Sequence, residues 1–220
     1  MLRVLLLVLL AAVPAAAQTD KRLPLFAVDV HPATVGLPQS EGWVPVVSAD
    51  TALPGRAWGA VVGGTVYPFR LGLATFGFGA SLTTGKGKSD PPEIVSGSGA
   101  NATTSPPTTP VVRTGITNLA PQISINFGQK LGWSYFSAGI GTSKVTSSAD
   151  AVGTTPGTIV PDSWNSALNF GGGAKWFMKR HLGASFDVRF IKLSSRGATA
   201  TLPSAKRTQI ITMSVGISIQ

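Results

Sequence analysis

Four charged residues stand in segments that are otherwise apolar or built of small residues, and they are the first candidates for chemistry. The four are Asp29, Lys175, Asp187 and Arg189. Opposite charges in such surroundings line a narrow pore, bind an ion or pair with one another, and pairing is what buried charges require. We interpret the four as a lumen charge cluster with a structural role, in which Lys175 lies close to Asp187, and we keep a narrow pore as an alternative.

The sequence offers little for acid–base or metal chemistry. It has two histidines and no cysteine, so that neither disulfide bonds nor thiolate metal sites are expected. We place His31 at the outer end of the first strand and His181 in a turn at the opposite end, too far apart to share a site. His31 with Asp29 nearby is the best candidate for a hydrolase, but no nucleophile, base and orienting group come together in the pattern. The sequence therefore indicates no catalytic residue, no metal and no cofactor.

The segments that carry the candidate charges alternate between apolar and polar residues with a period of two. In the clearest segment one face carries Ile211, Met213, Val215, Ile217 and Ile219, and the other carries Thr212, Ser214, Gly216, Ser218 and Gln220. This alternation is typical of a β-strand with one apolar side. We predict eight strands, near 23–31, 57–67, 72–83, 116–127, 133–145, 165–177, 183–193 and 208–219.

The predicted connections alternate between long and short along the chain. Long ones cover 32–56, 84–115, 146–164 and 194–207, and short ones cover 68–71, 128–132 and 178–182. Such alternation is typical of an antiparallel meander that crosses a membrane repeatedly. We expect two irregularities, a bulge near Tyr135 that reconciles the facing of its neighbours and a missing ladder hydrogen bond at Pro121.

Charges and aromatic residues indicate which side of the strands meets lipid. Nearly every charged residue falls in a connection or at a strand end, and the predicted outward faces carry none. A Lys or Arg on the lipid side at the membrane midplane costs about 2 to 4 kcal/mol, which explains this exclusion. Aromatic residues gather where the two water interfaces are expected, and we interpret them as an aromatic girdle. The girdle comprises Trp58, Tyr67, Phe69, Phe127, Trp133, Trp164, Trp176 and Phe177.

The N-terminal residues predict export. Arg3 precedes an apolar run from Val4 to Val13, and the alanines at 15–17 offer a cleavage site. We expect a signal peptide over residues 1–17 and one barrel domain over residues 18–220. We therefore do not expect the net charge of +9 to bind nucleic acid, because an exported chain does not meet nucleic acid.

Two strand-turn-strand segments carry a family resemblance. One is Gly63–Leu82, and the other is Gly171–Leu193, in which GGGAKWF is followed by a basic turn and then by ASFDVRF. They resemble the outer-membrane β-barrel domain of the OmpA-like superfamily. The resemblance implies an all-β, eight-stranded, antiparallel up-and-down transmembrane barrel in the outer membrane of a Gram-negative cell. It also implies membrane lipid and the barrel-assembly machinery as partners.

We expect a non-enzymatic monomer with an envelope-structural or surface-interaction role exerted through its four long loops. The loop cations are expected either to bind lipopolysaccharide phosphates or simply to be solvated, and they are Lys86, Lys88, Arg113, Arg196, Lys206 and Arg207. Trp43, in the first long loop, is expected to pack over the barrel mouth. The alternatives are a secreted lipocalin-like carrier of small ligands, an outer-membrane hydrolase that uses His31, and a narrow pore.

Overall fold

The structure is a computed structural model that describes residues 23–40, 42–44, 51–89, 91, 94–96, 103–105, 109–154, 156–200 and 203–220. The expected signal peptide, residues 1–17, lies outside the described residues, and the division into signal peptide and barrel domain stays a prediction. In the described part of the chain, no helix has the length and apolar character needed to cross a membrane.

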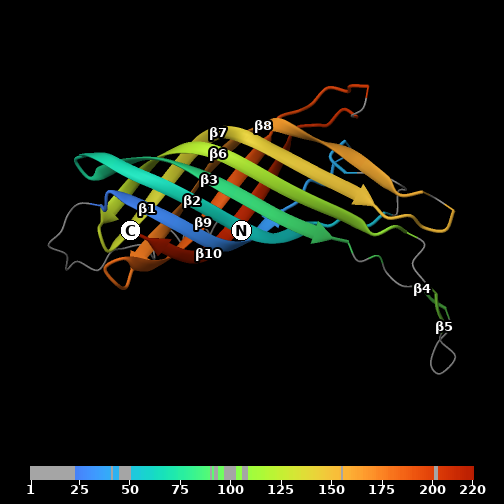
Figure 1. The fold of residues 1–220 in the computed structure, drawn as a ribbon, viewed down its shortest axis with the longest axis horizontal. Helices are drawn as coiled ribbons and strands as arrows, with labels where there is room; N and C mark the ends of the chain where they lie inside the picture. Colours follow the sequence, from blue (N-terminus) through green and yellow to red (C-terminus); the bar gives the residue numbers. More distant parts are fainter. Residues whose placement is uncertain are drawn as a thin grey trace, which may run out of the picture.

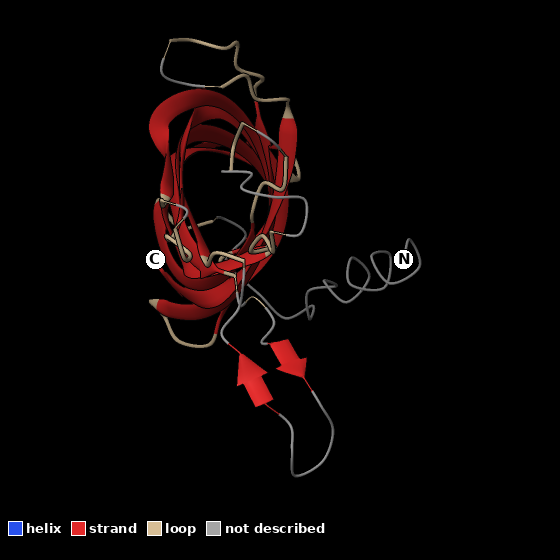
Figure 2. Ribbon diagram, turned by 90° about the vertical axis from the view of Figure 1, so that its right-hand side faces the viewer, coloured by secondary structure: helices blue, strands red, loops and turns tan. Residues whose placement is uncertain are grey.

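Eight long strands close into one ring, and the predicted antiparallel up-and-down barrel is confirmed (Figures 1 and 2). The strands follow one another around the ring in chain order, and β1 pairs with both β2 and β10 to close it. Closure leaves no strand at a sheet edge within the ring, so that backbone groups are paired all the way round. The strands are β1 (Phe26–Gly36), β2 (Arg56–Leu71), β3 (Ala74–Lys88), β6 (Val112–Gln129), β7 (Gly132–Ala149), β8 (Thr158–Phe177), β9 (Leu182–Leu193) and β10 (Thr208–Ile219).

Apolar side chains face outward and polar side chains face the lumen, as the alternation predicts. In β10, Val215 is 66% exposed and Ile217 is 52% exposed, whereas the side chain of Ser214 is buried in the barrel. In β9, Asp187 and Arg189 are likewise buried inside. Successive side chains of a strand point to opposite faces of the sheet, so each strand sends one largely apolar row outward and its other row into the lumen.

Most strands extend further than predicted toward the end of the barrel that carries the long connections, here called the long-loop end. β8 begins at Thr158 instead of 165, and β3 continues to Lys88 instead of ending at 83. These extensions are rich in Gly, Ser, Thr and charged residues, as in 84–88 of β3 and 112–115 of β6. The contrast between an apolar and a polar row fades there, so the alternation of side chains does not reveal these extensions. A further two-stranded ribbon, β4 (Ile94–Ser96) with β5 (Thr103–Ser105), lies in the segment predicted as one long loop.

The bulge expected near Tyr135 is wrong. Asn126 pairs with Tyr135 and Phe127 with Ser134 in an unbroken register, because Tyr135 faces the lumen while the next residue, Phe136, faces outward. The register shifts are elsewhere, between Val66 and Phe69 and between Val145 and Ser147. β6 continues through Pro121.

Two apolar clusters fill the barrel interior near its two ends. At the end with the short turns, the short-turn cluster consists of Ala27, Tyr67, Trp133, Tyr135 and Phe177. The long-loop cluster includes Val35, Leu37, Trp43, Ile116, Ile191, Leu193 and Ile210. Polar and charged side chains occupy the lumen between the two clusters. A barrel of eight strands is just wide enough for its own side chains to fill.

Candidate functional site

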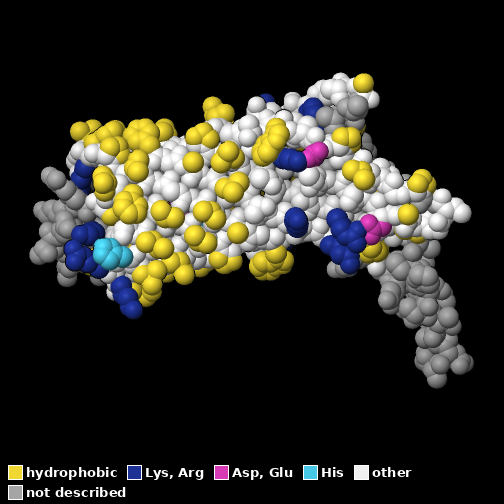
Figure 3. All heavy atoms as spheres, viewed as in Figure 1, with side chains coloured by type: hydrophobic (Ala, Val, Ile, Leu, Met, Phe, Trp, Pro, Cys, Tyr) yellow, Lys and Arg dark blue, Asp and Glu magenta, His cyan; other side chains and the backbone are white. Residues whose placement is uncertain are grey.

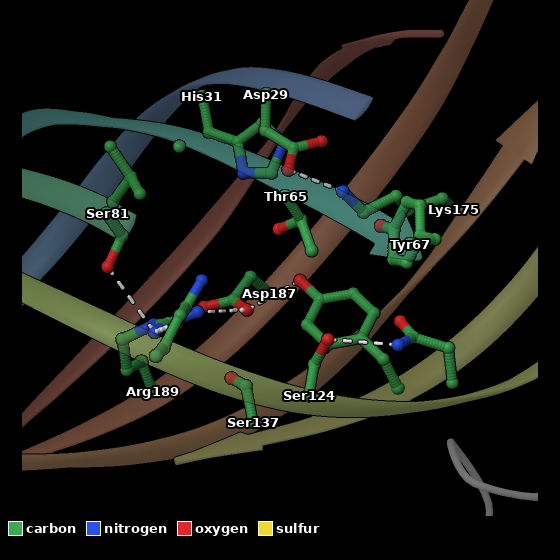
Figure 4. A pocket seen from close by; sticks show the side chains of 15 residues that line it. Asp29, His31, Thr65, Tyr67, Ser81, Ser124, Ser137, Lys175, Asp187 and Arg189 are labelled. Atoms are coloured by element: carbon green, nitrogen blue, oxygen red, sulfur yellow. Dashed lines mark hydrogen bonds and ion pairs between the residues drawn. The ribbon is translucent and has the colours of Figure 1, made fainter. Parts of the chain in front are cut away.

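The structure brings all four charged candidates into the lumen as two ion pairs (Figure 4). Lys175 Nζ lies 2.5 Å from Asp29 Oδ2, and Arg189 Nη2 lies 3.0 Å from Asp187 Oδ2. Lys175 and Asp187 line the same cavity but belong to different ion pairs. In the register Lys175 faces Ser185, while Asp187 faces Gly173 and is neutralised by Arg189 from its own strand.

Each carboxylate of the cluster also accepts a hydrogen bond from a hydroxyl group. Tyr135 Oη donates to Asp187 Oδ2 at 2.6 Å, and Ser218 Oγ donates to Asp29. Arg189 additionally donates to Gln122. Buried ion pairs need further hydrogen bonds to their remaining groups, and these hydroxyl and amide contacts supply them to both carboxylates and to Arg189.

His31 is the residue whose surroundings sequence reasoning missed. It lies within β1 and is buried in the lumen, not at the outer end of a strand. Its Nε2 lies 2.6 Å from Ser185 Oγ, and its Nδ1 lies 3.1 Å from Ser214 Oγ. Ser185 and Ser214 come from β9 and β10, and their position on the inward rows was the only signal in the sequence that pointed to this contact. His181 lies in the turn between β8 and β9, with its Nδ1 3.0 Å from the carbonyl oxygen of Gln220.

The contact between Ser185 and His31 resembles the nucleophile and base of a hydrolase, but the space around it is too small for a substrate. The lumen cavity has a volume of about 20 Å³ and is lined by both ion pairs and by His31. Such a volume holds about one water molecule. An acyl group cannot reach Ser185, so the pair acts as part of the hydrogen-bond network. Among the described residues, no three His, Cys, Asp or Glu side chains are grouped as metal ligands.

The aromatic girdle needs correction at three positions. Trp58, Phe69, Phe127, Trp164 and Trp176 are exposed on the outside of the barrel. Tyr67, Trp133 and Phe177 are instead buried in the short-turn cluster, where Trp133 stacks on Phe177 with ring centroids 5.1 Å apart. These three residues lie at the expected height along the barrel axis, but their side chains face the lumen and not the lipid. The period of two predicts a lumen-facing side chain for Phe177, because Phe177 lies on the same face of its strand as Lys175.

The outside of the barrel is an apolar belt (Figure 3). Large hydrophobic side chains on every long strand are exposed there, among them Ile123 at 60%, Ile140 at 73% and Val215 at 66%. A contiguous apolar surface of this extent is unfavourable in water. Two lysines, Lys144 and Lys192, do face outward, contrary to expectation, and each lies toward the long-loop end of its strand. The band between these lysines and the short turns is therefore a lipid-facing surface.

Comparisons with known proteins agree with this geometry. No protein-family model and no curated protein matches the sequence. Among solved structures the chain is similar to Neisserial surface protein A, with a TM-score of 0.50, 11% identity, and coverage of 89% of this chain and 97% of that chain. It is also similar to Ail, the attachment invasion locus protein of Yersinia pestis (TM-score 0.43, 9% identity, 88% and 95% coverage). The outer membrane protease OmpT from Escherichia coli is a further neighbour (TM-score 0.44, 7% identity, 76% and 64% coverage).

At these identities the likeness to Neisserial surface protein A shows the fold alone, and the expected eight-stranded barrel fold is confirmed. The location follows from the surface. Apolar side chains cover the outside, charged side chains are enclosed, and the ring leaves no open edge. A closed barrel with this distribution satisfies its backbone in lipid and is the β-structure that spans outer membranes. The chain is an outer-membrane β-barrel.

Proposed function

We propose that this protein is a closed, non-conducting outer-membrane barrel that contributes to the envelope or its surface contacts through its long-loop end. One observation carries the proposal, namely that the lumen is occupied along its length. Both ion pairs lie around a cavity of only about 20 Å³, with an apolar cluster toward each end of the barrel. Without an aqueous path or an internal ligand chamber, the surface is what remains for function.

The long-loop end supports a surface role because its first and last loops are tied together over the mouth. Trp43 is 2% exposed, and its Nε1 donates a hydrogen bond to the Lys206 carbonyl oxygen at 2.8 Å. The Arg196 guanidinium lies 5.1 Å from the Trp43 ring centroid and donates to the Gly42 carbonyl oxygen at 2.8 Å. These contacts hold two loops in one arrangement, which lowers the entropy cost of binding a partner there.

The structure gives specific reasons to set the alternatives below this proposal. A lipocalin-like carrier needs an internal apolar chamber, and this lumen is filled with paired charges. A hydrolase centred on His31 needs room for a substrate beside Ser185, and the cavity holds about one water molecule. A narrow pore needs a water-filled path along the lumen, and the two apolar clusters would both have to move aside to form one.

Ion conductance in planar lipid bilayers tests the proposal against the pore. We expect the folded wild-type protein to produce no conductance steps, because the lumen is blocked between the two apolar clusters. A variant with Trp133→Ala and Phe177→Ala, which thins the short-turn cluster alone, should also be silent since the charge network and the long-loop cluster remain. Reproducible unitary steps from the wild-type protein would contradict a closed barrel.

A further inference from the structure

A groove opens on the outer surface beyond the apolar belt, at the long-loop end. Its volume is about 570 Å³, and it lies over β3, β6, β7 and β8, which are neighbours in the ring. We call it the rim groove, and its lining includes Lys86, Lys88, Arg113, Gly115, Thr146 and Ile159. Small-ligand sites usually measure about 300 to 1,000 Å³, so the rim groove has room for a phosphorylated sugar.

Strand register sets cations along one side of the rim groove and apolar residues along the other. In one row across the sheet, Lys88 pairs with Arg113, Arg113 with Ser148, and Ser148 with Ile159. Ile159 is 77% exposed, and Val160 and Pro161 extend this apolar wall. The groove therefore offers positive charge and apolar surface within one site.

The floor of the rim groove is open because a glycine occupies it. Lys86 pairs with Gly115, and Gly115 pairs with Thr146. A Cβ at position 115 would meet Thr146 Oγ1 at 2.8 Å and Lys86 Cγ at 3.8 Å. Any side chain at position 115 would thus enter the space beside the lysine.

The acidic residues near the rim groove already have cationic partners. Asp150 pairs with Arg113, and Asp162 pairs with Lys144. The hydrogen bond from Lys144 lowers the pKa of the Asp162 carboxyl, so this ion pair is complete at neutral pH. Within the described part of the chain, Lys86 and Lys88 form no ion pair. Among the described residues, the groove therefore has two lysines without an acidic partner.

The rim groove lies at the level where lipid headgroups are expected. Lys86 pairs with Trp58, an exposed tryptophan of the kind that marks the membrane interface. Along β3, Lys86 lies four residues beyond Leu82 of the apolar belt. At ~3.3 Å per residue and a strand tilt of ~45°, this is about 9 Å along the membrane normal. Where the long-loop end faces outward, phosphate groups of the outer leaflet are expected at about this level.

We infer that the rim groove binds a phosphate-bearing glycolipid of the outer leaflet, with Lys86 and Lys88 on its phosphate and the wall at Ile159 against its sugar or acyl chain. Arg113 lines the groove but is paired with Asp150. The inference rests on the proposed function, in which the long-loop end is the one that makes surface contacts. It divides the six loop cations of the sequence into different roles. Arg196 is engaged in the contact with Trp43, while Lys206 and Arg207 lie outside the groove.

Lipid A titrated onto the folded full-length protein in detergent micelles, and followed by native mass spectrometry, tests the inference. Lys86→Gln with Lys88→Gln should weaken the affinity about tenfold, since each charged hydrogen bond to phosphate is a substantial part of the binding free energy. Gly115→Phe should weaken it comparably without changing the charge. Lys206→Gln with Arg207→Gln removes the same charge from exposed loop positions and should leave the affinity unchanged.

Two further arms identify the ligand. Lipid A without its phosphates should bind the wild-type protein and the lysine variant equally, and inorganic phosphate should not compete at comparable concentration. Equal weakening in both lysine and loop variants would overturn the rim groove as a site, as would wild-type affinity in the lysine variant. Competition by inorganic phosphate would overturn the assignment to a lipid. A heat-modifiable gel band from each variant shows that the barrel is folded, so these outcomes are separate from failure of the proposed closed barrel.

Discussion

At the scale of single residues, the lumen ion pairs are the central feature, and the sequence revealed their side but not their partners. Asp29 and Lys175 stand on inward rows that alternation identifies directly. Their strands, β1 and β8, are separated by β10 and β9 in the ring and meet only across the lumen. Which residues meet there depends on the stagger of the strands around the ring, and a period of two carries no information about it.

The pair of Asp29 and Lys175 predicts a strong coupling in stability. Asp29→Asn leaves the Lys175 ammonium buried without a counter-charge, and we expect it to lower the free energy of unfolding by about 3 kcal/mol. Lys175→Met should lower the free energy of unfolding by a similar amount, because it leaves the Asp29 carboxylate without a counter-charge. The double variant should recover much of the loss, because neither charge is then left unpaired. Urea unfolding of protein folded in phospholipid vesicles measures all four free energies, and additive losses in the double variant would show that the two residues are uncoupled.

At the scale of elements, strand sidedness could be predicted and strand length could not. Inside the belt each strand has one apolar and one polar row, and this contrast located the predicted strands. Beyond the belt the outward face needs no unbroken apolar row, so extensions such as 84–88 of β3, which read TGKGK, resemble loops in composition. The short-turn cluster was missed for a different reason. Its aromatic residues lie at the height of the membrane–water interface, where aromatic side chains usually face lipid, but here they are on the lumen-facing rows of their strands.

Adjacent tryptophans test the corrected sidedness. Trp176 is exposed outside on β8, whereas Trp133 is 3% exposed in the short-turn cluster, although their residues lie on paired strands. In vesicles of brominated lipid, Trp176→Phe should lower the fraction of tryptophan fluorescence that is quenched, because a lipid-facing emitter is lost. Trp133→Phe should raise this fraction, because it removes an emitter that lipid does not reach. The reverse order would place Trp133 in the girdle after all.

At the scale of the whole molecule, the barrel has an apolar outside and a closed, charged inside. The eight-stranded ring was predictable because the rule of one lipid-facing row and one lumen-facing row applies to every strand. Blockage of the lumen was predictable from strand number, since so narrow a barrel is filled by side chains. The rim groove was not predictable, because it depends on extensions that the sequence pattern does not reveal and on the register of four neighbouring strands.

A spin-label scan of β10 tests the orientation of the barrel wall most directly. The chain has no cysteine, so single cysteines can be introduced from Thr212 to Ile219 without other changes. In lipid vesicles, accessibility to dissolved oxygen should alternate with a period of two and peak at Met213, Val215 and Ile217, whose side chains are exposed outside. Maxima at Thr212, Ser214 and Ser218, or no alternation at all, would contradict a barrel whose apolar rows face the acyl chains.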